Sequence, residues 1–185
     1  MFKKFFGVSL PRTGTSSLYN AMRILKFHGK HYMDERGYQN VGWCKFANDY
    51  PISIRYKELD EKYPYSGFIY PDRPVEAWLD SYDTHWKRTG HLTIGDWDKW
   101  NMEVFGTLTF DRDLFRDAFL KHREEVFEYF KGRDDFLVLD MPYTDDAWSQ
   151  LCRFTGVLKP TRSFPNVNGS YAKENPWCPR NEVQR

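Results

Sequence analysis

Residues 5–18 join an apolar segment to an amphipathic helix through a turn rich in Gly, Pro, Thr and Ser. We predict a strand over 5–10 and a helix over 15–26, because Leu18, Ala21, Met22 and Leu25 recur at the i, i+3, i+4 and i+7 spacing of one helix face. A helix that starts directly after a turn presents unpaired backbone N–H groups and the positive end of its dipole. The segment therefore predicts a strand, loop and helix that hold a phosphate or sulfate.

Strand-like and helix-like segments alternate along the rest of the chain. Further strands are predicted at 30–33, 68–70 and 136–139, and further helices at 52–63, after Pro74, at 111–131 and at 145–155. This alternation is typical of an α/β fold with a central, mostly parallel sheet flanked by helices. A Trp-rich stretch at 87–106 shows no clear period and is expected to be a lid or a substrate loop.

Length and composition predict one enzyme-sized domain over residues 1–185, with an irregular tail at 157–185. The net charge is only +1, so we expect no nucleic-acid partner. No stretch approaches the roughly 20 apolar residues that span a bilayer, so no membrane association is expected. The three cysteines are widely spaced and form no CxxC pair, which favours reduced thiols in a cytoplasmic protein: Cys44, Cys152 and Cys178.

The loop differs from the phosphate loop of ATP- and GTP-dependent enzymes. That loop has the pattern G-x-x-x-x-G-K-[ST], whereas here Gly7 and Gly14 are one residue too far apart and Thr15 stands in place of the lysine. A nucleotide or small-molecule kinase of the P-loop type thus stays an alternative, as does a non-catalytic protein that binds a phosphorylated nucleotide.

The run Pro-Arg-Thr-Gly-Thr-Ser at 11–16 resembles the phosphosulfate-binding loop of sulfotransferases that use 3′-phosphoadenosine 5′-phosphosulfate (PAPS). The resemblance implies a three-layer P-loop-type fold and transfer of a sulfuryl group from PAPS to a hydroxyl or amine. It also implies adenosine 3′,5′-bisphosphate as the product and no metal. Arg12 is expected to stabilise the leaving phosphate, since a guanidinium is a planar and permanent cation. The loop residues expected to bind the donor are Pro11, Arg12, Thr13, Gly14, Thr15, Ser16 and Ser17.

A second element of the same family is an Arg that follows a strand, with a Ser eight positions later. Arg73 and Ser81 have this spacing after the strand predicted at 68–70, and the resemblance implies that they bind the 3′-phosphate of the donor. The Asp-Tyr-Pro run at 49–51 also resembles the segment that precedes this strand in the family.

Transfer to a hydroxyl or amine requires a group that accepts its proton. The family's His or Glu lies about twenty residues beyond the loop's basic residue, where His31 and Glu35 are found, although a strict count reaches Tyr32. Asp49 is the reserve candidate for this base. The acceptor is expected to be a small molecule or a glycan, and the tryptophans that either border it or belong to the core are Trp86, Trp97 and Trp100.

Overall fold

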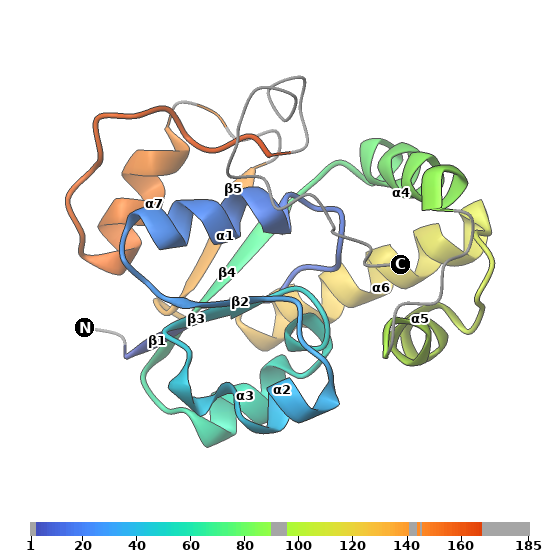
Figure 1. Cartoon of the computed structure of the whole chain (residues 1–185), viewed down its shortest axis with the longest axis horizontal. Helices are drawn as coiled ribbons and strands as arrows, with labels where there is room; N and C mark the ends of the chain where they lie inside the picture. Colours follow the sequence, from blue (N-terminus) through green and yellow to red (C-terminus); the bar gives the residue numbers. More distant parts are fainter. Residues whose placement is uncertain (1–2, 90–95, 141–143, 145, 168–185) are drawn as a thin grey trace, which may run out of the picture.

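The computed structural model describes residues 3–89, 96–140, 144 and 146–167, and its centre is a five-stranded sheet in which every strand pair is parallel (Figure 1). The order across the sheet is β2-β3-β1-β4-β5. The strands are β1 (Lys4–Gly7), β2 (Gly29–His31), β3 (Phe46–Asn48), β4 (Ser66–Asp72) and β5 (Phe136–Asp140). Because all strands run the same way, their carboxyl ends meet at one edge.

Helices cover both faces of the sheet, so the predicted three-layer α/β fold is confirmed. On one face α1 (Thr15–Ile24) and α7 (Ala147–Thr155) pack against apolar side chains of the sheet. On the other face lie α2 (Glu35–Gln39), α3 (Tyr56–Lys62) and the carboxyl half of α6 (Arg112–Tyr129). Among the described residues, no helix is long and apolar enough to cross a membrane.

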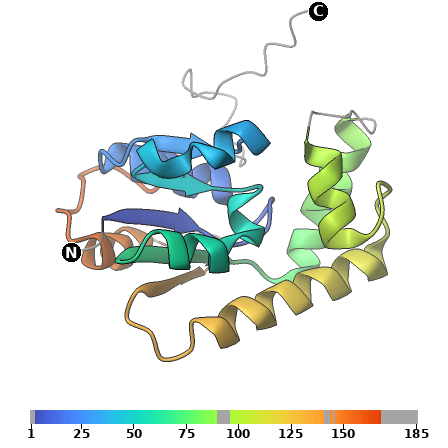
Figure 2. The ribbon, with the colours of Figure 1, turned by 90° about the horizontal axis from the view of Figure 1, so that it is seen from below.

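A third apolar cluster lies beyond the carboxyl edge of the strands. It is formed by α4 (Val75–Thr89), α5 (Trp97–Phe105) and the amino half of α6, and Figure 2 shows α6 running from these helices along the sheet. The stretch 87–106, in which the sequence shows no clear period, is helical at 87–89, where α4 ends, and at 97–105, which form α5. Trp100 and Phe105 are buried there and hold α5 against α6. Residues 90–95 lie outside the described part of the chain.

The predicted boundaries of several elements differ from the observed ones. Strand β1 ends at Gly7 and not at residue 10, although the Val8 N–H still donates to the carbonyl of Ile69 at 2.9 Å. Strand β3 was not predicted at all, because three residues are too few to show a period. The tail has neither helix nor strand over 157–167, the part of it that the structure describes.

Candidate functional site

The loop between β1 and α1 is held in shape by its own side chains. Thr13 is buried, and its hydroxyl donates to the carbonyl of Leu10 at 2.8 Å while it accepts from Ser9 Oγ at 2.7 Å. Gly14, the N-cap of α1, has a φ of 97°, a left-handed conformation that favours glycine. Arg12 also has a positive φ of 71°. The loop therefore curls around the amino end of α1, where backbone N–H groups lack helical partners.

The hydroxyls of the first turn of α1 tie the loop to three other segments. Thr15 donates to Asp49 Oδ2 at 2.8 Å, Ser16 Oγ lies 3.0 Å from His31 Nε2, and Ser17 Oγ accepts from the Val167 N–H at 3.1 Å. His31 ends β2 and Asp49 directly follows β3. The structure thus brings these two predicted residues to the predicted loop.

Arg12 and Arg73 meet beside the loop. Arg73 Nη1 donates to the Arg12 carbonyl at 2.8 Å, and Arg12 Nη2 lies 3.4 Å from Ser81 Oγ. The Trp78 indole N–H donates to the Pro11 carbonyl at 2.8 Å, so α4 is anchored to the same loop. The predicted cluster of loop, Arg73 and Ser81 is therefore assembled in space.

These two arginines differ from five others of the described residues, each of which binds a carboxylate. Burial lowers the pKa of both guanidiniums, and Arg88 contributes to the effect at Arg12. Among the described residues neither forms an ion pair with a carboxylate, and the buried Nε of Arg12 has no hydrogen-bond partner. Elsewhere carboxylates raise the pKa of the arginines they bind, namely Arg55, Arg112, Arg116, Arg123 and Arg133. The corner around Arg12 and Arg73 therefore carries positive charge that Asp49 and Asp80 offset only from beyond ion-pair distance.

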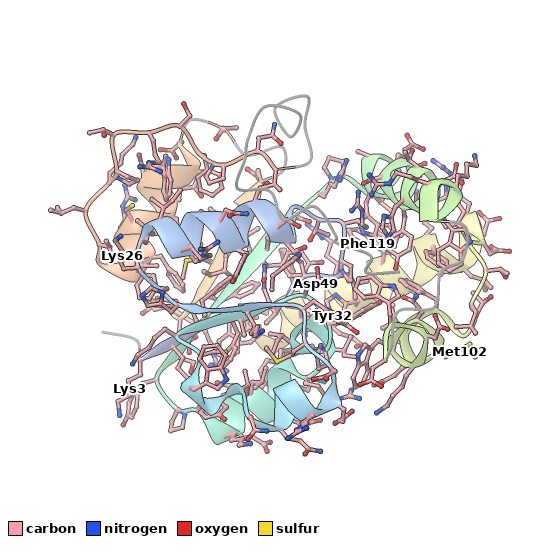
Figure 3. All side chains as sticks on the ribbon, in the orientation of Figure 1. Lys3, Lys26, Tyr32, Asp49, Met102 and Phe119 are labelled. Carbon is pink, nitrogen blue, oxygen red and sulfur yellow. The ribbon has the colours of Figure 1, made fainter. Side chains whose placement is uncertain are left out.

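Asp49, His31 and Asn48 form one polar cluster at the carboxyl ends of β2 and β3. His31 Nε2 lies 3.7 Å from Asp49 Oδ2, and His31 Nδ1 lies 3.1 Å from Asn48 Oδ1. Asp49 is buried, with a φ of 70°, and its Oδ1 accepts from the Tyr50 N–H at 2.9 Å. Figure 3 shows Asp49 and Tyr32 where the sheet meets the helices beyond its edge. The cluster can exchange a proton with a group bound at the loop.

A cavity of about 100 Å³ lies in front of the loop. Besides residues of the loop, its lining includes Tyr32, His85 and Trp97. Burial, together with nearby Asp96, raises the pKa of Tyr32 to about 12, whereas burial and the charges of Arg12 and Arg88 lower the pKa of His85 to about 4. His85 is therefore neutral at pH 7. The cavity is lined by Pro11, Arg12, Gly14, Thr15, Ser16, His31, Tyr32, Asp49, His85 and Trp97.

Sequence reasoning missed two of the residues at this site. His85 lies four positions after Ser81 on a predicted helix, so the helical period could have placed it on the same face. Asn48 had no such signal, because its strand was not predicted.

Other candidates lie away from the cavity. Glu35 begins α2, and its carboxylate binds Lys99 Nζ at 2.6 Å. Trp100 is buried in the cluster of α4, α5 and α6, and Trp86 packs against that cluster, so only Trp97 of the three tryptophans borders the cavity. Cys44 and Cys152 are buried free thiols. The described residues include no group of three or more His, Cys, Asp or Glu arranged to hold a metal ion.

Comparison with known protein families identifies the family to which the chain belongs. A family model described as a sulfotransferase domain matches residues 29–172, which run from β2 into the tail and begin after the loop. No curated protein matches the chain. Since the match covers well over half of its residues, the chain belongs to the sulfotransferase domain family.

Proposed function

We propose that this protein transfers the sulfuryl group of PAPS to a hydroxyl or amine of a small molecule or glycan. The observation that carries the proposal is the pair of half-buried guanidiniums, Arg12 and Arg73, which form no ion pair with a carboxylate of the described residues. Asp49 and Asp80 act on them only from farther away. A buried cation without a counter-charge is costly unless a ligand supplies one. An anion with charges at two separate positions meets that requirement.

The residues of the corner fit the donor. The amides at the start of α1 and the Arg12 guanidinium would hold its phosphosulfate, because both present donors to oxygen anions. Arg73 and Ser81 would hold its 3′-phosphate, since they lie on the β4 side of the loop. The buried Nε of Arg12 is a donor that the fold leaves unused among its described residues.

The chain's own groups account for the chemistry. When bound, PAPS supplies a sulfuryl group joined to a phosphate that can leave. Arg12 places a fixed positive charge beside that phosphate, and the low exposure of the corner strengthens the interaction. His31 Nε2 faces the cavity wall formed by Ser16 and can take the proton of the acceptor. Asp49 Oδ2, 3.7 Å away, then faces the imidazolium and stabilises its charge.

The acceptor would lie against the aromatic side of the cavity, which Tyr32 and Trp97 form. The centres of these two rings are 5.2 Å apart, so the rings contact each other, and Trp97 also meets Tyr50 edge-on at 5.2 Å. Flat aromatic walls suit sugar rings and phenols.

Calorimetry on the purified protein tests the donor. We expect adenosine 3′,5′-bisphosphate to bind at least tenfold more tightly than adenosine 5′-monophosphate, because Arg73 and Ser81 add a second anion site. Equal binding of the two nucleotides would contradict the assignment. Tighter binding of magnesium ATP would favour the kinase alternative, and binding of the bisphosphate without transfer from labelled PAPS to any acceptor of a library would favour a non-catalytic binding protein.

A further inference from the structure

Asn48 is a buried polar residue at the end of β3. Both the nitrogen and the oxygen of its side-chain amide make a polar contact. Asn48 has no exposed surface. Its Nδ2 donates to the Thr15 carbonyl at 2.7 Å, and its Oδ1 lies 3.1 Å from His31 Nδ1. Asn48 therefore connects the first turn of α1 to the histidine at the end of β2.

The two contacts of Asn48 determine where the proton of His31 resides. A backbone carbonyl only accepts hydrogen bonds, so the amide atom that faces Thr15 must be the nitrogen. The oxygen of the amide consequently faces His31, and it too only accepts. Nδ1 of His31 must then carry a hydrogen, which leaves Nε2 of the neutral ring with a lone pair. Ser16 Oγ, at 3.0 Å, is placed to donate to that lone pair, so its hydroxyl must turn away before Nε2 takes a proton from another group.

We propose that Asn48 is a positioning residue that holds His31 in the Nδ1–H tautomer and so makes Nε2 the atom that takes the acceptor's proton. The part of this inference that concerns proton transfer rests on the proposed function, whereas the tautomer does not. Nε2 is the ring nitrogen that faces both Ser16 and Asp49. In the opposite tautomer Nε2 would carry the hydrogen and could not act as a base.

The neighbouring strand keeps Asn48 in place. Gly7 of β1 pairs with Asn48, and a β-carbon added to Gly7 would lie only 2.6 Å from the β-carbon of Asn48. That distance is too short for any side chain, so the absence of one at Gly7 is what admits Asn48. The Tyr19 ring stacks on His31 with ring centres 5.7 Å apart and restricts the imidazole from the α1 side.

The groups that face His31 suit this role. The neutral amide of Asn48 orients the ring without adding charge, and the Asp49 carboxylate supplies the negative charge that a protonated ring needs. A histidine whose second nitrogen is bound by an oriented partner is the usual way in which proteins select a tautomer. Asn48 thus orients the ring of His31, and the adjacent residue Asp49 supplies the negative charge.

Nitrogen NMR of histidine side chains in the full chain tests the tautomer directly. At a pH where His31 is neutral, we expect its Nδ1 to be protonated and its Nε2 to show the shift of an unprotonated nitrogen. A His31→Gln variant assigns the signals. An Nε2–H tautomer of His31 would overturn the proposal, and this readout holds even if the protein transfers no sulfuryl group.

Variants test the consequence for catalysis. Asn48→Leu removes both contacts, so we expect His31 to populate both tautomers and kcat to fall at least tenfold, with the KM for PAPS changed less than threefold. Asn101→Leu is the matched control, because Asn101 is equally buried and its Oδ1 accepts from Tyr82 at 3.2 Å away from the cavity. The control should lose stability and retain kcat. If Asn48→Leu does not fold, Gly7→Ala displaces Asn48 by a smaller change and should shift the same tautomer signals. An unchanged His31 tautomer in a folded variant that lacks the Asn48 contact would refute the positioning role.

Discussion

Replacing Arg12 with methionine distinguishes the effect of its buried charge on stability from its effect on catalysis. Methionine keeps an unbranched stem and a β-carbon, so the strain of the positive φ at residue 12 is unchanged. The guanidinium disappears, and with it a buried Nε that has no partner and a long 3.4 Å contact with Ser81. An unpaired buried donor costs about 1–3 kcal/mol, whereas such a long contact contributes little.

We therefore expect Arg12→Met to stabilise the ligand-free protein by about 1 kcal/mol, which raises Tm by roughly 2–4 °C for a chain of this length. The same variant should lose at least about a hundredfold in kcat/KM, because one charged donor at the transition state contributes about 3 kcal/mol. Differential scanning calorimetry with and without adenosine 3′,5′-bisphosphate measures the first effect. Wild-type protein at a hundred times Kd should gain about 2.7 kcal/mol from the ligand, and the variant should gain much less.

Arg133→Met is the matched control, since Arg133 binds two carboxylates. Its Nη1 donates to Asp60 Oδ2 at 2.6 Å and its Nε to Asp135 Oδ1 at 2.8 Å. Removing it should lower stability by about 1–2 kcal/mol after allowance for solvent screening, and should leave turnover unchanged. The reasoning fails if both variants lower Tm equally, or if Arg12→Met retains turnover with an acceptor that the wild type sulfates.

Three further outcomes follow from other parts of the structure. Arg73→Met should weaken binding of adenosine 3′,5′-bisphosphate about 10- to 100-fold by calorimetry while leaving adenosine 5′-monophosphate unaffected, because it removes a charged donor to the 3′-phosphate alone; equal weakening of both would remove Arg73 from that role. Trp97→Ala should raise the KM of the acceptor and not that of the donor, since Trp97 lines the cavity from α5 and is not part of the loop; a change confined to the donor would contradict this role. Burial lowers the pKa of His122 to about 4, below its ordinary value of 6.5, so the unfolded chain binds the proton first and stability falls as pH drops from 6.5 to 4. His122→Gln should reduce that fall by up to about 3 kcal/mol in urea titrations at each pH, and parallel curves for variant and wild type would refute the assignment.

Much of the fold follows from local patterns in the sequence. The helical period of Leu18, Ala21 and Met22 predicted α1, and these side chains are buried as expected. Gly14 and the hydroxyls after it predicted a tight turn into a helix, because the left-handed backbone and the unpaired amides depend only on neighbouring residues. The spacing of Arg73 and Ser81 predicted that both could reach one phosphate. In the structure each of them contacts Arg12, and their binding of one phosphate stays a prediction.

The residues around His31 were decided by tertiary structure. Strand β3 has three residues and forms because it can pair with β1 on one side and β2 on the other, an interaction between segments far apart in the chain. That pairing alone brings Asn48 to Thr15 and His31, and Asp49 to the same loop. Likewise, α5 is recognisable only once α4 and α6 bury its apolar side chains. By itself the sequence predicted an anion-binding loop and an α/β fold, because both depend on local conformation and periodicity. Only the folded chain decided which ring nitrogen of His31 faces that loop, because parallel strands join residues that are distant in sequence.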